Sequence, residues 1–304
     1  MGRIGFVGLG RMGRPMASNL QRKGFDLVVY DINRAPCDTL AELGALVADS
    51  VAGVVREAPT VFTCLPSHVE VEAVLLGAEG LIAHARPGTT VVEMSTIDPE
   101  VTDRCAQGLA AAGMHCIDAP IGRLASHADA GESLFMVGAE EAEFSAIRPM
   151  LEAMGTSIHH CGPVGTGIRT KLVNNYLAIT LCQINAEALA LTRRFGLDLE
   201  RTLEVLHGTT ATNGQLKINY ATKVLTGDIA PGFQIDLAHK DLSLVTQAAN
   251  ASRVPMPVAA AARECLSLAR ARGWGGYDFS ALLDALCESA GIEQVRFPTA
   301  DGAD

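Results

Sequence analysis

Three polar residues interrupt a long stretch of small and apolar residues between Gly165 and Leu191. Lys171, Asn174 and Asn175 occur in "KLVNNYLAI", where each would cost about 1–3 kcal/mol if it were buried without a partner. In a helix their spacing of i, i+3 and i+4 places all three side chains on one face. Solvation of a helix end explains one lysine, but three aligned polar residues favour a cleft between two domains.

An amine on such a face suits acid–base chemistry at a carbonyl carbon. A partly desolvated lysine has a lowered pKa, so near neutral pH it can give a proton to the alkoxide that hydride transfer creates. In the oxidative direction it removes that proton. A lysine beside an aldehyde can also form a Schiff base, as in an aldolase, but that chemistry needs no nicotinamide.

A glycine-rich segment near the start of the chain predicts a dinucleotide site. "GFVGLGRMGRPM" places Gly8, Gly10 and Gly13 in G-x-G-x-x-G register, directly after an apolar run and before a helical pattern. Gly8 permits the tight turn, Gly10 lets the backbone approach a pyrophosphate, and Gly13 allows close helix–strand packing. The helix N-terminus then offers free N–H groups to the anion. The other predicted cofactor residues of this turn are Leu9, Arg11 and Met12.

The second apolar run ends in Asp31, 23 residues after Gly8, where a ribose-binding acid is expected. Its carboxylate can accept both ribose hydroxyls and would repel a 2′-phosphate. This favours NAD over NADP, although Arg34 nearby opposes that preference in part. Two later strand ends should also face the cofactor, because ligands bind at the carboxyl ends of parallel strands. They carry Leu65 and Pro66 in "CLPS", and Ser95 and Thr96 in "MST".

The elements that hold these residues follow from the hydrophobic pattern. Residues 3–160 alternate short β-rich runs with amphipathic stretches, which predicts a doubly wound, Rossmann-like α/β domain with a parallel sheet. From 165 to 286 the pattern is helical, so an all-α domain follows, and a long helix joins the two. The predicted strands are 3–7, 26–30, 60–64, 89–94, 114–118 and 133–137. The later helices are predicted at 165–195, 198–207, 213–225, 236–252, 257–272 and 279–290.

Composition limits the class of protein. A chain of 304 residues with 48% hydrophobic and 19% charged residues fits two globular domains. We expect an NAD-binding domain at 1–163, an all-helical substrate and oligomerisation domain at 164–296, and a flexible tail at 297–304. A net charge of −10 argues against binding to nucleic acid or to an anionic membrane. Eight cysteines without metal-ligand spacing, and no recognisable signal peptide, predict a cytoplasmic protein without a metal.

The motifs together resemble one family over almost the whole chain. In order, they are "GFVGLGRMG", "CLP", "EMST", "DAPIGR", "GTGIRTKLVNN" and "AHKDL". This series resembles the β-hydroxyacid dehydrogenases, which include 3-hydroxyisobutyrate dehydrogenase and tartronate semialdehyde reductase. The resemblance implies a Rossmann-like domain, a long interdomain helix and an all-helical domain. It also implies NAD(P)-linked interconversion of a 3-hydroxy acid and its semialdehyde, in a homo-oligomer that is usually a dimer or a tetramer.

The resemblance also implies roles for single residues. Lys171 corresponds to the catalytic acid/base, Asn175 to a residue that supports the substrate, and Lys240 to one that closes the site near the cofactor. In the family, "D-x-P-V-S-G-G" binds the acid group of the substrate. This sequence has "DAPIGRLAS" instead, so Gly122 and Arg123 replace the serine and a glycine.

That replacement favours a sulfonate as the acid group. A sulfonate is tetrahedral and spreads its charge over three oxygens, and Arg123 offers five N–H groups with a permanent charge. The loop, with "GIRTKLVNNY" and "DLAHKDL", resembles the 3-sulfolactaldehyde reductases, which form 2,3-dihydroxypropane-1-sulfonate in sulfoquinovose breakdown. We therefore expect NADH-dependent reduction of 3-sulfolactaldehyde. The expected substrate-binding residues are Gly122, which gives the backbone room to approach, Arg123, Asn174, Asn175 and Ser95.

Other interpretations stay open. Arg123 could instead pair with Asp118 or Asp129, and the substrate would then be a carboxylate such as 3-hydroxyisobutyrate, or tartronate, methylmalonate or succinate semialdehyde. A non-catalytic dinucleotide-binding protein of this fold is less favoured, because such a protein would be expected to lack Lys171. Imine reductases, a related group, usually carry a different residue at that position.

Overall fold

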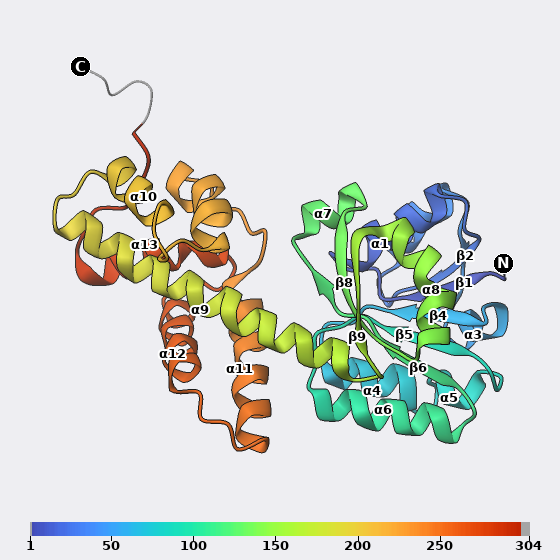
Figure 1. Ribbon diagram of the computed structural model, residues 1–304. Helices are drawn as coiled ribbons and strands as arrows, with labels where there is room; N and C mark the ends of the chain where they lie inside the picture. The colour runs from blue at the N-terminus through green and yellow to red at the C-terminus, as the bar shows by residue number, and fades with distance from the viewer. Residues whose placement is uncertain (1, 299–304) are drawn as a thin grey trace. The chain divides into compact units, whose positions relative to one another are not determined.

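The computed structural model describes residues 2–298, and the chain divides into two compact units, Met1–Lys171 and Leu172–Asp304 (Figure 1). The first unit is α/β and the second is helical. Helix α9 (Thr166–Arg194) begins in the first unit and continues into the second. The fold class predicted from the sequence is therefore confirmed.

A nine-stranded sheet forms the centre of the first unit. Its strands are β1 (Ile4–Val7), β2 (Leu27–Tyr30), β3 (Leu46–Val47), β4 (Thr60–Thr63), β5 (Thr90–Glu93), β6 (His115–Asp118), β7 (Ile121–Gly122), β8 (Ser133–Gly138) and β9 (Gly155–Gly162). The order is β3-β2-β1-β4-β5-β6-β8-β7, with β9 paired to β8. The chain leaves β1 toward β2 and β3 and returns on the other side at β4. This change of direction places a ligand crevice at the carboxyl ends of β1 and β4.

Helices cover both faces of the sheet (Figure 1). Phe6 and Phe62 pack on one face with α1 and α8, and Val61, one residue along β4, packs on the other with α3, α4 and α6. This alternation is the two-residue period of a strand that is buried on both sides. The helices of this unit are α1 (Gly13–Arg22), α2 (Arg34–Glu42), α3 (Val51–Glu57), α4 (His68–Leu76), α5 (Leu81–His84), α6 (Pro99–Ala111), α7 (Ala125–Ala130) and α8 (Glu141–Met154).

Each of the six predicted strands is present, with ends that differ by one residue at most. The sheet is mostly parallel, as predicted, but β8 is antiparallel to both β6 and β7. A parallel return needs a crossover of a dozen or more residues, usually a helix that covers the sheet. Between β6 and β8 the chain forms only β7 and the six-residue helix α7.

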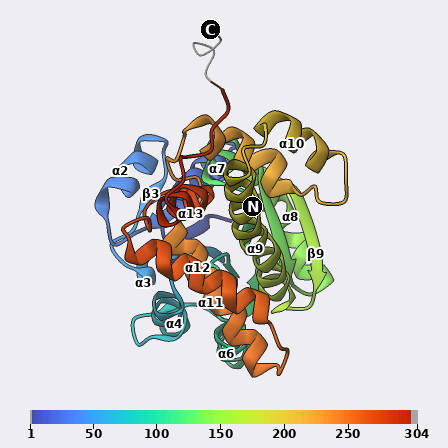
Figure 2. The same cartoon turned by 90° about the vertical axis from the view of Figure 1, so that its left-hand side faces the viewer.

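The second unit packs its helices around one apolar cluster. Helices α11 and α12 lie side by side (Figures 1 and 2). The helices are α10 (Leu199–His207), α11 (Ile235–Ala251), α12 (Pro257–Ala271) and α13 (Leu282–Ala290).

The predicted helix at 213–225 was wrong in detail. The structure has a π-helix, η1 (Gln215–Tyr220), and a short 3₁₀ turn at Val224–Thr226. The side chain of Asn213 accepts the N–H of Leu216 and exchanges hydrogen bonds with Asn185. This tie to α9 anchors the segment where the wider π-turn begins.

One face of α9 carries exposed apolar side chains. Its apolar side chains at positions 173, 177, 184 and 191, with Phe195 just beyond its end, are 46–66% exposed. Their spacing of 4, 7, 7 and 4 residues keeps them on one side of a helix. We call these five residues (Val173, Leu177, Ile184, Leu191 and Phe195) the α9 stripe.

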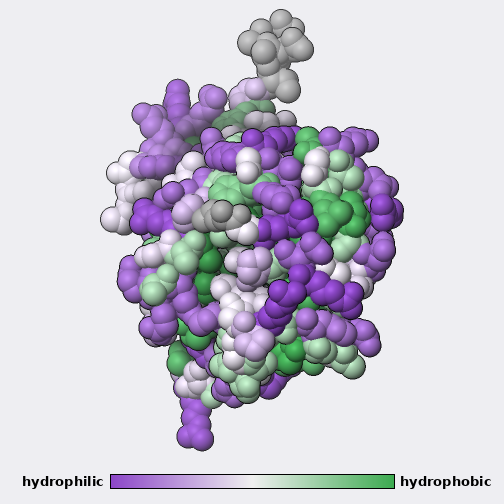
Figure 3. Space-filling model, turned by 90° about the vertical axis from the view of Figure 1, so that its right-hand side faces the viewer, coloured by the Kyte–Doolittle hydropathy of each residue, from purple (hydrophilic) through white to green (hydrophobic). Residues whose placement is uncertain are grey.

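Within residues 2–298, no helix is long and apolar enough to cross a membrane. Hydrophilic and hydrophobic residues are interspersed over the face shown in Figure 3.

The N–H of Phe297 donates to the carbonyl of Leu225. The rest of the predicted tail, from 299 onward, lies outside the described residues.

Candidate active site

The glycine-rich turn between β1 and α1 has the geometry that a dinucleotide requires. Gly8 has φ +91°, and a Cβ there would meet the carbonyl oxygen of Cys64 at 2.3 Å. A Cβ on Gly13 would lie 2.0 Å from the carbonyl of Gly8, so both positions exclude a side chain. Gly10 has no heavy atom within 4 Å of its Cβ position, which leaves its backbone open to a ligand. Arg11 and Met12 complete the turn before α1, where the N–H of Arg14 donates to the carbonyl of Gly10.

Asp31, at the end of β2, closes one side of this turn. Its two carboxylate oxygens accept the N–H groups of Leu9, at 2.6 Å, and of Asn33, at 2.7 Å. Each oxygen keeps a second lone pair for a ribose hydroxyl. A cavity of about 400 Å³ lies here. It is lined by Leu9, Gly10, Arg11, Arg14, Asp31, Asn33, Ala35, Pro36 and Thr39. These residues fit the adenosine end of NAD.

The two later strand ends that the sequence singled out contact each other. The N–H of Leu65 donates to the hydroxyl of Ser95 at 2.8 Å. The N–H of Ser95 donates in turn to the buried carboxyl of Glu93 at 2.9 Å. The segments that follow β4, with Pro66, and β5, with Thr96, are therefore fixed together at the carboxyl edge of the sheet. Burial raises the pKa of Glu93 to about 7, and hydrogen bonds from Ser95 oppose that rise.

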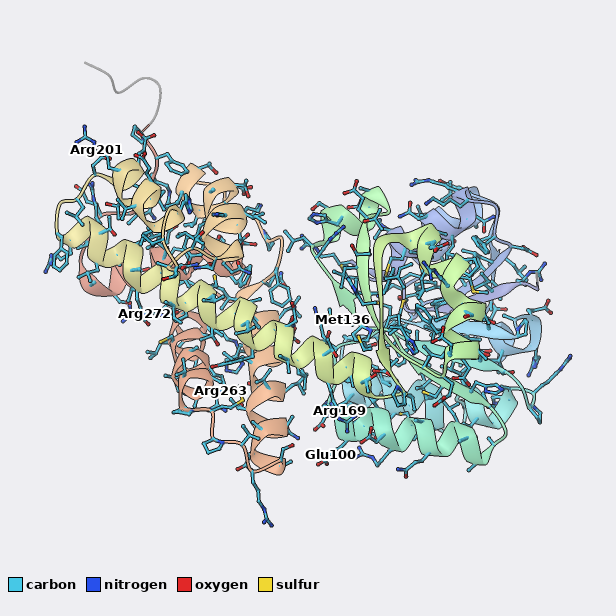
Figure 4. The ribbon with its side chains drawn as sticks, in the orientation of Figure 1. Glu100, Met136, Arg169, Arg201, Arg263 and Arg272 are labelled. Carbon is cyan, nitrogen blue, oxygen red and sulfur yellow. The ribbon has the colours of Figure 1, made fainter. Side chains whose placement is uncertain are left out.

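Asp118, at the end of β6, binds the start of α9. Its two oxygens accept the N–H groups of Gly165 and Ile168, both at 2.6 Å. Burial raises the pKa of Asp118 to about 6, and these two N–H groups oppose the rise. Arg169, labelled in Figure 4 near the first turns of α9, forms a second tie through two hydrogen bonds to Asp103 on α6. The beginning of α9 is thus fixed to the sheet and to α6.

Lys171 lies one turn further along α9 and is 9% exposed. Asn174 and Asn175 share its helix face, as their spacing predicts. The amide of Asn174 donates to Asn175, whose own amide donates to Asp241 on α11 at 2.7 Å. Lys240 lies 3.2 Å from the same carboxylate. Asp241 therefore links two of the predicted site residues, Asn175 and Lys240.

Arg123 follows β7 and adopts φ +70°, a left-handed conformation that costs a residue with a side chain about 1 kcal/mol or more. Its guanidinium donates to the carbonyl of Glu132 at 2.6 Å and to the hydroxyls of Thr156 and Ser157 at 3.0 and 3.1 Å. The suggested partners Asp118 and Asp129 are not among these acceptors.

Gly122, just before it, does not leave open space for a ligand in the way we expected. A Cβ at this residue would meet the side chains of Leu134 and Met136 on β8, at 3.0 and 3.4 Å. The pairing of β7 with β8 fills that side. Gly122 is also buried.

Sequence reasoning missed Arg14, Glu93 and the anchoring role of Asp118 in the first unit, and Asp241 in the second. Only Glu93 and Asp118 carried a usable signal, since each is an acid that ends an otherwise apolar strand. Arg14 and Asp241 depend on packing between elements. Within residues 2–298, no three His, Cys, Asp or Glu side chains are grouped so that they could hold a metal ion.

Comparison with known proteins agrees with this geometry. Residues 3–162 match the family model of the NAD binding domain of 6-phosphogluconate dehydrogenase. Residues 165–286 match that of the NAD-binding region of NADP-dependent 3-hydroxyisobutyrate dehydrogenase. The fold and its site therefore define an NAD(P)-dependent oxidoreductase that acts on CH–OH groups of small hydroxy acids or on the corresponding aldehydes.

Individual relatives identify the family within this class of oxidoreductases. The chain is 40% identical to 3-sulfolactaldehyde reductase of Escherichia coli (strain K12), over 96% of this chain and 98% of that protein. It is 34% identical to 2-(hydroxymethyl)glutarate dehydrogenase of Eubacterium barkeri, over 95% and 96%. The structure of Mycobacterium tuberculosis 3-hydroxyisobutyrate dehydrogenase with L-serine matches with a TM-score of 0.86 at 31% identity, over 94% and 99% of the two chains. The chain belongs to the 3-hydroxyisobutyrate dehydrogenase family of β-hydroxyacid dehydrogenases.

The buried carboxyl of Glu93 predicts a pH-dependent cost in stability. Its folded pKa of about 7 lies above the ordinary value of 4.5, so the free energy of unfolding should fall as the pH rises from about 4.5 to 7. Glu93→Gln removes this cost and keeps an oxygen that can accept the N–H of Ser95. Relative to wild type, the variant should gain stability over that range, by on the order of 3 kcal/mol at pH 7.

Urea unfolding at several pH values measures this difference. Glu42→Gln, at an exposed position at the end of α2, controls for the loss of one negative charge. If the difference in free energy of unfolding between Glu93→Gln and wild type does not change with pH, the raised pKa of Glu93 is contradicted.

Proposed function

We propose that this enzyme reduces 3-sulfolactaldehyde to 2,3-dihydroxypropane-1-sulfonate with NADH as the hydride donor. The observation that carries the proposal is the left-handed backbone of Arg123, at a position where the family motif has a glycine. Glycine adopts that conformation without strain, whereas arginine does not. A side chain held there against strain suits a charged binding role. The 40% identity to a 3-sulfolactaldehyde reductase supports the same substrate.

The bonding of Arg123 is compatible with this role. Its contacts within residues 2–298 use both N–H groups of Nη1 and one of Nη2. Of the five N–H groups of a guanidinium, the Nε–H and the second Nη2–H remain for an anion. One N–H on each of two neighbouring nitrogens can bind two oxygens of a sulfonate at once. The acceptors Glu132, Thr156 and Ser157 hold the group in place beforehand.

Lys171 is proposed as the proton donor to the developing alkoxide. The support for this role is the low exposure of Lys171, 9%, and its place on the polar face of α9. Asp118 and Arg169 fix the helix turn that precedes it. Ser95, whose hydroxyl accepts the N–H of Leu65, is proposed to contact the substrate. Asn174 and Asn175 share the helix face of Lys171 and are proposed to support the substrate.

NADH is the proposed cofactor because Asp31 lines the cavity beside the glycine turn. Arg34, which opposed this preference in the sequence, bonds Asp38 at 2.8 Å and is not among the residues that line the cavity. The proposed cofactor residues are otherwise those expected from the sequence: Gly8, Leu9, Gly10, Arg11, Met12, Gly13, Leu65, Pro66, Thr96 and Lys240.

A homo-oligomer is also proposed, and the α9 stripe supports it. Large apolar side chains on one face of a helix usually bury that face against another element. A second copy of the chain is the proposed occupant.

Loss of Lys171 should remove catalysis more than cofactor binding. For Lys171→Ala we expect kcat to fall by about 10²- to 10⁴-fold, the usual contribution of general acid–base catalysis. The affinity for NADH, measured by fluorescence titration, should stay within about threefold of wild type, since Asp31 and the glycine turn are unchanged. Lys217→Ala, at an exposed position on η1, is the control. If kcat falls less than tenfold, another group is the acid.

Exchange of Arg123 should change the choice of substrate. Arg123→Gly restores the glycine of the family motif and removes the cation, so kcat/KM for 3-sulfolactaldehyde should fall by about 10- to 100-fold. The values for tartronate and succinate semialdehyde should fall less, and the ratio between substrates is the measured quantity. Arg253→Gly is the matched control, because Arg253 is also an arginine with positive φ, of +56°, in the second unit. A wild-type preference for a carboxylate substrate would overturn the sulfonate assignment, as would a variant that keeps its sulfonate preference.

The oligomer can be tested by light scattering. Wild type should have the mass of a dimer or a tetramer, and Leu177→Lys together with Ile184→Lys should lower it, because each places a charge in an apolar interface. Val258→Lys, on α12 instead of α9 and 51% exposed, is the control. A monomeric wild type would exclude the oligomer.

A further inference from the structure

Four side chains from α11 and α12 form an alternating series of polar contacts in the second unit. Arg270 on α12 donates through Nε to Asp236 on α11 at 2.5 Å, and through Nη1 to Nδ1 of His239 at 3.0 Å. The other ring nitrogen, Nε2 of His239, lies 3.0 Å from the hydroxyl of Ser267 on α12. The two helices lie side by side (Figure 2), so these contacts join them. The ion pair between Arg270 and Asp236 is exposed and contributes little by itself, so the two hydrogen bonds of the ring provide most of the restraint.

These contacts require a neutral imidazole with its proton on Nε2. A guanidinium only donates hydrogen bonds, so Nδ1 of His239 must accept the one from Arg270. The single hydroxyl hydrogen of Ser267 is donated to the carbonyl of Arg263, a residue labelled in Figure 4, at 3.1 Å. The hydroxyl oxygen therefore accepts the Nε2–H of His239. A proton on Nδ1 would remove the acceptor and place a second cation against Arg270.

The charged groups around the ring change its pKa in both directions. Burial lowers the pKa of His239 below its ordinary value of 6.5, and Arg270 and Arg263 lower it further. Glu264 on α12 and Asp236 on α11 oppose this fall. The contribution of the neutral ring to the joining of the two helices is therefore complete above pH 6.5, and it is lost as the pH falls through the lowered pKa.

The opposite side of α11 carries contacts of the candidate active site. Asp241 follows His239 by two residues, about 200° around the helix, and its carboxylate accepts the amide of Asn175 on α9. Lys240, between them in sequence, lies 3.2 Å from the same carboxylate. Helix α11 thus has a polar contact with α12 on one side and with α9 on the other. A shift of α11 along α12 would move Lys240 and change the contact between Asp241 and Asn175.

We infer that His239 is a positioning residue of this enzyme. In its neutral form it fixes α11 against α12 and so holds Lys240 and Asp241 in place for catalysis. Protonation of the ring at acidic pH releases them. The inference rests on the proposed roles of Lys240 and Asn175, but it does not depend on which acid group the substrate carries.

Initial rates as a function of pH test this inference, with whichever aldehyde the wild type reduces as the substrate. His239→Gln keeps an acceptor and an N–H donor but does not titrate, so its kcat/KM should lie within about threefold of wild type at pH 7.5. The ratio of variant to wild type should rise about threefold or more between pH 7.5 and 5, because only wild type loses the contact with Arg270. Groups such as Asp118 titrate in both proteins and cancel in the ratio.

Two further variants separate positioning from other effects. His239→Leu removes both hydrogen bonds of the ring and should lower kcat/KM by about tenfold at pH 7.5. His207→Gln, at the end of α10, replaces the other histidine of the second unit. It is the matched control, and its ratio to wild type should not change with pH. If His239→Leu does not fold, His239→Gln carries the test.

Nitrogen-15 NMR of the imidazole gives a readout that needs no substrate. In wild type at pH 7.5, His239 should be the Nε2–H tautomer, and the ring should become charged only below pH 6.5. An Nδ1–H tautomer, a pH-independent ratio for His239→Gln, or wild-type activity of His239→Leu overturns the inference. If wild type reduces carboxylate semialdehydes but not 3-sulfolactaldehyde, the proposed substrate fails, while each of these outcomes keeps its meaning.

Discussion

The carboxylate of Asp118 is the contact on which the candidate active site depends. It accepts two backbone N–H groups at the start of α9, so the end of a central strand determines where that helix begins. Lys171 follows Ile168 by three residues, within the same rigid helix. The position of the amine is therefore set by one buried carboxylate and the helix backbone, which α6 reinforces through Asp103 and Arg169. The negative charge of Asp118 is also stabilised by the positive end of the α9 helix dipole.

This arrangement constrains the residues around it. A Cβ on Gly138 would lie 2.1 Å from an oxygen of Asp118, and one on Gly167 would lie 2.8 Å from the other. Glu93 lies opposite Asp118 in the β5–β6 pairing, so two acids occupy neighbouring buried positions. The charge of Asp118 adds to the effect of burial and raises the pKa of Glu93 further. Two carboxyl groups are therefore buried at the carboxyl edge of the sheet, at a cost in free energy. The loops that they hold in place are those expected to bind cofactor and substrate.

The sequence predicted those residues whose type is dictated by the local backbone conformation. Gly8 and Gly13 were recognisable because the turn leaves no room for a Cβ there, and Asp31 because it ends a strand at a set distance from that turn. The helix face of Lys171 followed from spacing alone. The antiparallel β8, the π-turn near Asn213 and the stripe on α9 were not predictable, because each depends on which distant segments pair. Asp241 and Arg14 were missed for the same reason, since no local motif marks them.

The same arrangement recurs at three of the polar residues that the sequence predicted as binding residues. Asp31 is held by two backbone N–H groups, Asn175 by Asp241, and Arg123 by Glu132, Thr156 and Ser157. Because hydrogen bonds already hold each side chain in place, ligand binding costs less side-chain conformational entropy than it would with a freely rotating side chain. For Arg123 this restraint offsets the left-handed backbone and leaves two N–H groups with a fixed direction. A fixed pair of donors discriminates by geometry as well as by charge. A tetrahedral anion can present two oxygens to such a pair and still turn a third toward neighbouring donors, whereas a planar carboxylate uses both of its oxygens at once.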